Sequence, residues 1–129
     1  MHRTIRVLSV GQCAVDGPRL HHFLRDVLGA RVDSADTAAA AVRLAAGPRA
    51  IRYDLVVVNR VLASDGGPGV DVVAALRAAG CPAPIMLISD LESAQHEAQR
   101  RGAIRGFGKS QIDDPVVIDR LRAVVHAHV

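Results

Sequence analysis

The sequence has few aromatic residues, few cysteines and no long hydrophobic run. Aromatic residues make up 2% of the 129 residues, with no tryptophan, so a folded core must be aliphatic. Cys13 and Cys81 lie far apart and lack the neighbouring cysteines or histidines of a metal-ligand motif, which indicates free thiols. No apolar segment approaches the roughly 20 residues that cross a bilayer. These absences predict one cytoplasmic domain over residues 1–129, with no membrane contact, no structural metal and no cofactor.

The positive charge is mild and dispersed. Formal net charge is +3 and the isoelectric point is near 9.5, mostly from arginines spread along the chain. The only local cluster of cations comprises Arg100, Arg101, Arg105 and Lys109, which we attribute mainly to complementation of a helix dipole. Nucleic-acid binding requires a denser cluster, so we expect no direct nucleic-acid partner.

Short apolar runs alternate with longer segments of helical periodicity. The expected strands are residues 5–10, 30–34, 55–58, 84–88 and 104–107, and the expected helices begin near residues 16, 37, 70, 92 and 115. Asp16 is expected to cap the first helix, and Asp36 or Thr37 the second. Five strand–helix units in strict alternation predict an α/β domain with a parallel sheet and helices on both faces.

The residue that most directly suggests a function is Asn59. It follows residues 53–58 (Tyr-Asp-Leu-Val-Val-Val), a run typical of a strand buried on both faces. The first polar residue after such a strand lies at the carboxyl edge of the sheet, where open α/β domains place their working groups. A carboxylate there would suit nucleophilic attack or metal binding, whereas an amide does neither well.

Four segments, in this order, resemble the receiver domain of two-component response regulators (CheY-like). Residues 53–59 look like a third strand ending at the phospho-acceptor, residues 69–77 like the start of the third helix, residues 84–89 like the fourth strand with its hydroxyl residue, and Gly102-Ala103 followed by Lys109 like the fifth strand with its lysine. The resemblance covers nearly the whole chain. It implies a single flavodoxin-like, three-layer α/β/α domain with a five-stranded parallel sheet of order 2-1-3-4-5 and five helices.

The acidic residues of the family are missing from the matching positions. Receivers carry two acidic residues after the first strand that help to hold Mg²⁺, and Gly11 and Gln12 stand there in this chain. Asn59 matches the acceptor aspartate. Without these carboxylates, and with Lys109 kept, the pocket should be net positive and should not bind Mg²⁺. An amide oxygen is also a poor nucleophile, so phosphorylation is not expected.

Other parts of the family's apparatus are retained or altered. The hydroxyl residue matches Ser89 and the lysine matches Lys109, while Gly106 occupies the position of the aromatic switch on the fifth strand. Lys109 is expected to bond the Asn59 side-chain oxygen or a backbone carbonyl, or to point into solvent.

The resemblance therefore implies a non-enzymatic pseudo-receiver that serves as a protein-interaction module, independent of phosphorylation and Mg²⁺. Receivers usually contact signalling partners through the fourth helix, fifth strand and fifth helix. On this chain that face would include Gln95, Gln99, Arg105, Arg120 and Ala123, and its basic character would suit an acidic partner. Val117, Leu121 and Val124 could support a homodimer, although most of them should be core.

Two other functions remain open. Lys109, Ser89 and the backbone amides near Gly11 could form a small-anion or nucleotide site, although the sequence contains no G-x-x-x-x-G-K-[ST] phosphate loop. The chain could instead be the N-terminal regulatory domain of a DNA-binding response regulator.

Overall fold

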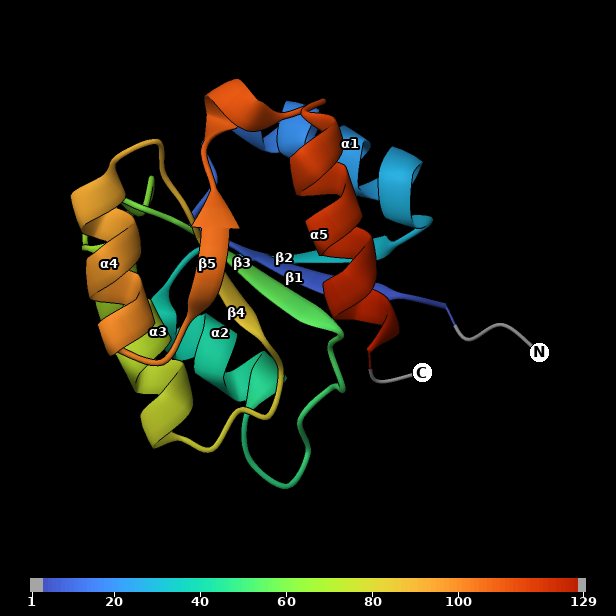
Figure 1. Cartoon of the computed structure of the whole chain (residues 1–129). Helices are drawn as coiled ribbons and strands as arrows, with labels where there is room; N and C mark the ends of the chain where they lie inside the picture. Colours follow the sequence, from blue (N-terminus) through green and yellow to red (C-terminus); the bar gives the residue numbers. More distant parts are fainter. Residues whose placement is uncertain (1–3, 128–129) are drawn as a thin grey trace.

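The computed structural model describes residues 4–127, which form a parallel five-stranded sheet of order β2-β1-β3-β4-β5 (Figure 1). The strands are β1 (Arg6–Val10), β2 (Arg31–Ala35), β3 (Leu55–Asn59), β4 (Ile85–Ile88) and β5 (Ile104–Phe107). This order confirms the flavodoxin-like fold. The expected strand limits agree with the observed ones to within one residue.

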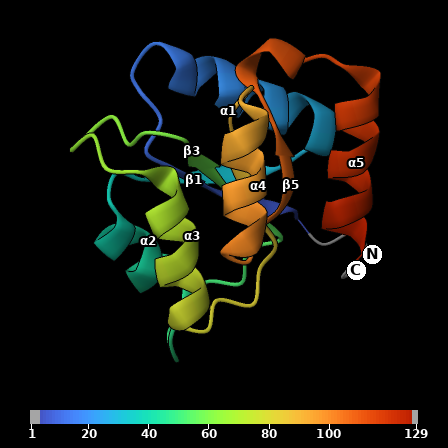
Figure 2. The same cartoon turned by 60° about the vertical axis from the view of Figure 1, so that its left-hand side comes forward.

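Helices cover both faces of the sheet (Figures 1 and 2). They are α1 (Asp16–Leu28), α2 (Ala38–Ala45), α3 (Gly69–Ala78), α4 (Glu92–Arg100) and α5 (Pro115–His126), with a 3₁₀ turn η1 (Lys109–Gln111) before α5. One hydrophobic cluster joins the sheet to α2, α3 and α4, and a second joins it to α1 and α5. Within residues 4–127, none of these helices has the length and apolar character needed to cross a bilayer.

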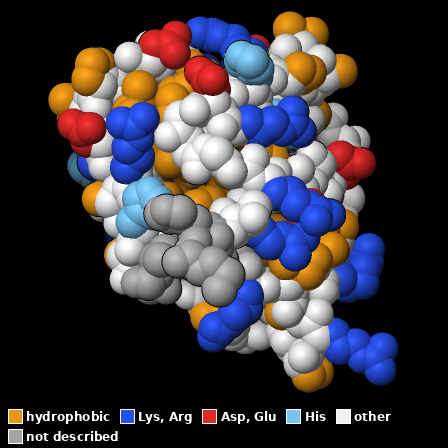
Figure 3. Space-filling view, turned by 90° about the vertical axis from the view of Figure 1, so that its right-hand side faces the viewer, with side chains coloured by type: hydrophobic (Ala, Val, Ile, Leu, Met, Phe, Trp, Pro, Cys, Tyr) orange, Lys and Arg blue, Asp and Glu red, His pale blue; other side chains and the backbone are white. Residues whose placement is uncertain are grey.

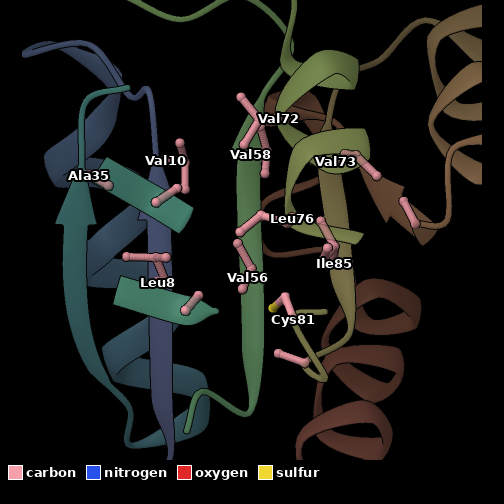
Figure 4. Close-up of a cluster of buried hydrophobic side chains, with 14 of the residues drawn as sticks. Leu8, Val10, Ala35, Val56, Val58, Val72, Val73, Leu76, Cys81 and Ile85 are labelled. Carbon is pink, nitrogen blue, oxygen red and sulfur yellow. The ribbon is translucent and has the colours of Figure 1, made fainter. Parts of the chain in front are cut away.

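The central strand β3 contributes to both clusters. Val56 and Val58 point toward α2–α4, and Figure 4 shows them beside Leu76 and Ile85. Leu55 and Val57 belong to the opposite cluster with α1 and α5. All four β3 side chains are fully buried, as expected for a strand covered on both faces. The core is aliphatic apart from a few aromatic rings, as the composition requires.

The cap expected for α2 is confirmed at Thr37, and the cap expected for α1 at Asp16 is wrong. Thr37 Oγ1 accepts a hydrogen bond from Ala40 N at 3.1 Å, and Asp114 caps α5 by accepting from Val116 N at 2.9 Å. Asp16 is the first helical residue of α1 and not its cap. The sulfur of Cys13 accepts the Asp16 N–H at 3.2 Å, and the Cys13 thiol lies 3.6 Å from the Asp16 carboxylate, to which it donates.

Strand β5 contains a bulge beside β4. Met86 pairs with Ile104 and Ile88 pairs with Phe107, so two β5 residues, Arg105 and Gly106, lie opposite a single β4 residue. The extra residue keeps Ile104 and Phe107 on the same face, toward α1 and α5. It also presses the backbone of Gly106 against β4, because a Cβ there would lie 2.1 Å from the carbonyl oxygen of Leu87.

A second close backbone contact closes the end of β3. Gly69, the first residue of α3, donates its N–H to Arg60 O at 2.7 Å, and a Cβ on it would lie 2.1 Å from Asn59 O. Val61 and Pro68 form an antiparallel bridge across this β3–α3 loop. The loop is therefore a hydrogen-bonded hairpin that folds back over the carboxyl edge of the sheet.

Gly69→Ala should destabilise the protein by about 1–3 kcal/mol or more, because the methyl group collides with backbone that has nowhere to move. Gly67→Ala is the matched control, since its nearest neighbour would be the carboxylate of Asp65, an exposed side chain that can shift at the cost of its hydrogen bond with the Gly67 N–H. Chemical denaturation of the two variants measures the difference. Equal stabilities would contradict this description of the loop.

Candidate functional site

The residues that match the receiver pocket lie together at the carboxyl edge of the sheet. Asn59, Ser89 and Lys109 line a hollow of about 410 Å³, together with residues that adjoin them in the chain. Gly11 adjoins Asn59 at the end of β1, and Gln12 follows it. The sequence thus predicted which residues would meet here, but several of their contacts differ from the expected ones.

Asn59 acts as a hydrogen-bond donor. Its Nδ2 donates to Gly11 O at 3.2 Å and to Val61 O at 2.8 Å. Both partners are carbonyl oxygens, so the group that faces them must carry protons. An ionised carboxylate has none to give, and in this position it would face two acceptors at hydrogen-bond distance. The surrounding backbone therefore fits an amide at residue 59 and not an aspartate.

Gly11 has no room for a side chain. Its φ is +76°, and a Cβ built on it would lie 2.2 Å from Leu62 Cδ2. Leu62 is 3% exposed and comes from the β3–α3 hairpin, whose Ala63 N–H also donates to Gly11 O at 3.1 Å. Apolar packing thus fills the position at which the family places a carboxylate.

Lys109 is paired with an acidic residue that the sequence analysis assigned to another role. Its Nζ lies 2.8 Å from Oδ2 of Asp16. The hydrogen bond and the charge of Lys109 lower the pKa of the Asp16 carboxyl below its ordinary value. The pair's contribution to stability is therefore present above the ordinary carboxyl pKa and is lost as the pH falls through the lowered one. The expectation of an uncompensated positive pocket was wrong, because Asp16 neutralises Lys109.

The three groups that could form a small-anion site each have a partner within the protein. Ser89 is 8% exposed, and its Oγ accepts the N–H of Leu91 at 3.1 Å. The Gly11 N–H is bonded to Ala35 O at 2.9 Å, and Lys109 is bonded to Asp16. Each of the three groups is thus bonded to another part of the protein, although Ser89 and Lys109 line the same hollow.

The pocket does not fit the Mg²⁺ that receivers use. Mg²⁺ prefers carboxylate oxygens in octahedral geometry, but Asp16 is held by Lys109, and Asp90 accepts the hydroxyl proton of Ser110. The side-chain oxygen of Gln12 is buried without a hydrogen-bond partner, but it is a neutral amide. Over residues 4–127, no group of three or more histidine, cysteine, aspartate or glutamate side chains could hold a metal ion.

Gln95 was expected on the interaction face, but it is 2% exposed and bridges α4 to the sheet. Its Nε2 donates to Leu87 O at 2.9 Å and to Ser89 O at 3.0 Å, and its Oε1 accepts from Gly106 N at 2.9 Å. Leu87 and Gly106 lie at the β5 bulge and Ser89 follows the end of β4, and the Gln95 amide binds a backbone group of each. The glycine at residue 106 therefore does more than stand where receivers carry an aromatic residue, because its backbone N–H is bound by Gln95.

The other predicted face residues are at least partly exposed, but the face is less basic than expected. Gln99, Arg105 and Ala123 are exposed. Arg105 binds both carboxylate oxygens of Glu92, which lowers the pKa of that carboxyl. Arg120 donates to the Gly106 carbonyl at 3.0 Å.

The apolar residues suggested for a homodimer lie in the core. Val117 and Leu121 are 1% and 0% exposed, and Val124 packs against the same cluster. Val117 and Leu121 are therefore not available for a dimer surface, and Val124 is only partly exposed.

Three residues of the site were not predicted in their observed roles, namely Asp16, Leu62 and Gln95. Asp16 meets Lys109 across 93 residues of sequence, and no local pattern signals that pairing. The i, i+3 spacing of Gln95 and Ala98 could have suggested that both face inward, because Ala98 is fully buried.

Gln95→Leu should lower the free energy of unfolding by about 2–4 kcal/mol, since three buried backbone groups lose their partner. Gln99→Leu, on the exposed side of the same helix, is the control and should change stability by less than about 0.5 kcal/mol. Urea denaturation measures both. A Gln95→Leu variant as stable as the control would show that the bridge contributes nothing.

The chain resembles solved response-regulator structures over nearly its whole length. No protein-family model and no curated protein sequence matches it. A two-component response regulator from Clostridium difficile superposes with a TM-score of 0.75 at 17% identity, covering 97% of this chain and 98% of that one. The signal receiver domain of a modulated diguanylate cyclase from Desulfovibrio desulfuricans G20 gives 0.69 at 28% identity, covering 97% and 93%.

A response regulator from Burkholderia pseudomallei, solved with a phosphorylated aspartic acid, a calcium ion and citrate, gives 0.69 at 19% identity, covering 96% of this chain and 68% of that one. These neighbours are response regulators and receiver domains, and this chain has the CheY-like receiver fold.

Proposed function

We propose that the protein is a pseudo-receiver, a receiver-type interaction module that works without aspartyl phosphorylation and without Mg²⁺. The observation that carries this proposal is the donor role of Asn59 toward the carbonyls of Gly11 and Val61. The Asn59 amide donates hydrogen bonds to the backbone of the pocket, and an ionised aspartate could not make these bonds.

The chemistry of phosphoryl transfer is unsupported at this site. Transfer needs a nucleophilic oxygen and stabilisation of the negative charge on the moving group. Lys109, which matches the family's lysine, is neutralised by Asp16. The position that would supply a metal-binding carboxylate is the glycine beneath Leu62.

An interaction role is supported by the construction of the α4–β5–α5 face. The Gln95 bridge holds α4 against β4 and β5, and Arg120 ties α5 to the Gly106 carbonyl. The three elements thus present Gln99, Arg105, Arg120 and Ala123 in one fixed arrangement. Such a surface suits a signalling protein that recognises the fold in a single conformation, and no chemical step is needed to create it. The module is non-enzymatic in this proposal.

Incubation with acetyl phosphate and Mg²⁺ should leave the intact mass unchanged, because residue 59 offers no nucleophile. The same result is expected for Asn59→Asp, since restoring one carboxylate does not restore a metal site. A phosphate-sized increment that peptide mapping places on residue 59 in either protein would refute the proposal.

Asn59→Asp should destabilise the protein by about 1–3 kcal/mol at neutral pH, because it exchanges two donated hydrogen bonds for contacts between acceptors. Asn59→Ala is the control, since it removes the donors without adding charge and should cost less. The introduced carboxyl would have a raised pKa, so the loss should shrink as the pH falls below that pKa and the group becomes a donor. Denaturation at neutral and acidic pH measures both effects. Stability equal to that of the native protein at neutral pH would contradict the donor role.

A further inference from the structure

The cations that cluster in the sequence are neutralised in the structure. Arg100 and Arg101 pair with Glu97, Arg105 pairs with Glu92, and Lys109 pairs with Asp16. Arg101 also lies 3.4 Å from Asp71. This segment therefore presents little free positive charge.

A different set of arginines, scattered through the sequence, gathers at the amino edge of the sheet. Arg6 and Arg31 begin β1 and β2 and are paired in register, while Arg6 and Arg52 line the same hollow of about 480 Å³. Arg25 lies in the last turn of α1, and Arg122 of α5 reaches that turn by donating to Val27 O at 3.3 Å. We call this set the amino-edge arginine surface; it comprises Arg6, Arg25, Arg31, Arg52 and Arg122.

Acidic residues compensate this surface only in part. Asp33 pairs with Arg6 at 3.1 Å and lies 3.8 Å from Arg31, and Asp54 is 3% exposed and accepts the Arg6 backbone N–H. Asp26 is exposed next to Arg25 in the last turn of α1, so five arginines stand against three aspartates. Arg25, Arg52 and Arg122 have no ion-pair partner among residues 4–127. In Figure 3, Lys and Arg side chains are spread over the middle and lower part of the view, whereas the acidic side chains that can be seen lie in its upper half.

The surroundings of these arginines favour one kind of partner. Protein interfaces are anchored by apolar or aromatic side chains, yet the large exposed hydrophobic residues of the described chain follow the carboxyl ends of strands, at the opposite edge. They are Val15, Val61, Leu91 and Val116. Tyr53, the aromatic residue of the amino-edge hollow, is 7% exposed and donates its hydroxyl proton to Asp33, so it cannot stack on an unpaired base. Guanidinium groups without apolar anchors or stacking rings match the phosphate oxygens of a double helix.

We propose that the amino-edge arginine surface binds the phosphate backbone of duplex DNA without reading its sequence. This departs from the expectation drawn from the sequence, in which these arginines are dispersed. It is independent of the proposed pseudo-receiver function, because the surface lies at the edge of the sheet opposite to Asn59.

Fluorescence anisotropy of a labelled duplex, titrated with the full chain, tests the proposal. The dissociation constant should be on the order of 10⁻⁵ M at physiological salt, and duplexes of unrelated sequence should bind equally. A plot of log K against log salt should have a slope of about −3.5 to −4.5, as four or five phosphate contacts predict. No binding at a protein concentration of about 1 mM would overturn the proposal.

Two double variants with the same loss of charge locate the surface. Arg25→Gln with Arg52→Gln should weaken binding by at least about 10-fold and make the slope shallower by about 2. Arg19→Gln with Arg60→Gln, at the carboxyl edge, is the control and should change affinity by less than about 2-fold. All four residues are exposed, and circular dichroism verifies that both variants fold. Equal weakening by the two variants would show that net charge alone is responsible and would refute the assignment.

Competition identifies the class of polyanion. Unlabelled duplex should displace the probe at lower concentration than a polyglutamate peptide, or vesicles containing phosphatidylserine, at equal total charge. Stronger displacement by the peptide or by the vesicles would assign the surface to an acidic protein or to a membrane and would overturn the proposal.

Discussion

The amide of Asn59 is the contact on which the carboxyl edge of this sheet depends. By donating to Gly11 and Val61 it joins the ends of β1 and β3 and fixes the start of the β3–α3 hairpin. That hairpin carries Leu62 over Gly11 and brings Gly69 against the last carbonyl of β3. One group thus sets the geometry of the pocket, and because it must be a proton donor it cannot also be the nucleophile of a phosphoryl transfer. The proposed loss of phosphoryl transfer rests on the same hydrogen bonds that shape the pocket.

At the β4–β5 edge, as at Asn59, a side-chain amide makes hydrogen bonds that fix the backbone. The bulge at Arg105 and Gly106 frees backbone groups from the sheet ladder, and the buried amide of Gln95 satisfies them. A side chain at residue 106 would collide with the Leu87 carbonyl, so the bulge and the glycine require each other. A helix held by three buried hydrogen bonds has little freedom to shift, because breaking them would leave polar groups unpaired inside the protein. The α4–β5–α5 face beside this helix is consequently suited to be presented to a partner in a single conformation.

Acidic and basic side chains tend to lie at opposite ends of the strands. Every helix starts near the carboxyl edge and ends near the amino edge, and the helix dipole favours acidic residues at the first end and basic residues at the second. Asp16 in the first turn of α1 and Arg25 in its last turn follow this rule. This rule explains why an acidic partner for Lys109 lies at the carboxyl edge. The alternation of strands and helices brings the ends of several helices and the starts of several strands together at the amino edge, where arginines from separate segments accumulate.

The pattern of strands and helices could be read from the sequence because it depends on local periodicity. Residues 53–58 identified the central strand, and Thr37 identified the start of a helix, since each signal involves neighbours along the chain. The resemblance carried by residues 53–59 and 84–89 supplied the sheet order, which the structure confirms. The same segments placed Asn59, Ser89 and Lys109 at one edge, because the carboxyl ends of parallel strands lie side by side.

The sequence by itself thus determined that the chain is an α/β domain whose acceptor position holds an amide. Only the tertiary structure decided what that amide does, which acid neutralises Lys109, why Gln95 is buried and where the arginines collect. These outcomes depend on contacts between residues as many as 93 positions apart and on backbone groups that a bulge leaves unpaired. A hydrogen bond or an ion pair is set by distance in space, and composition and periodicity do not specify that distance.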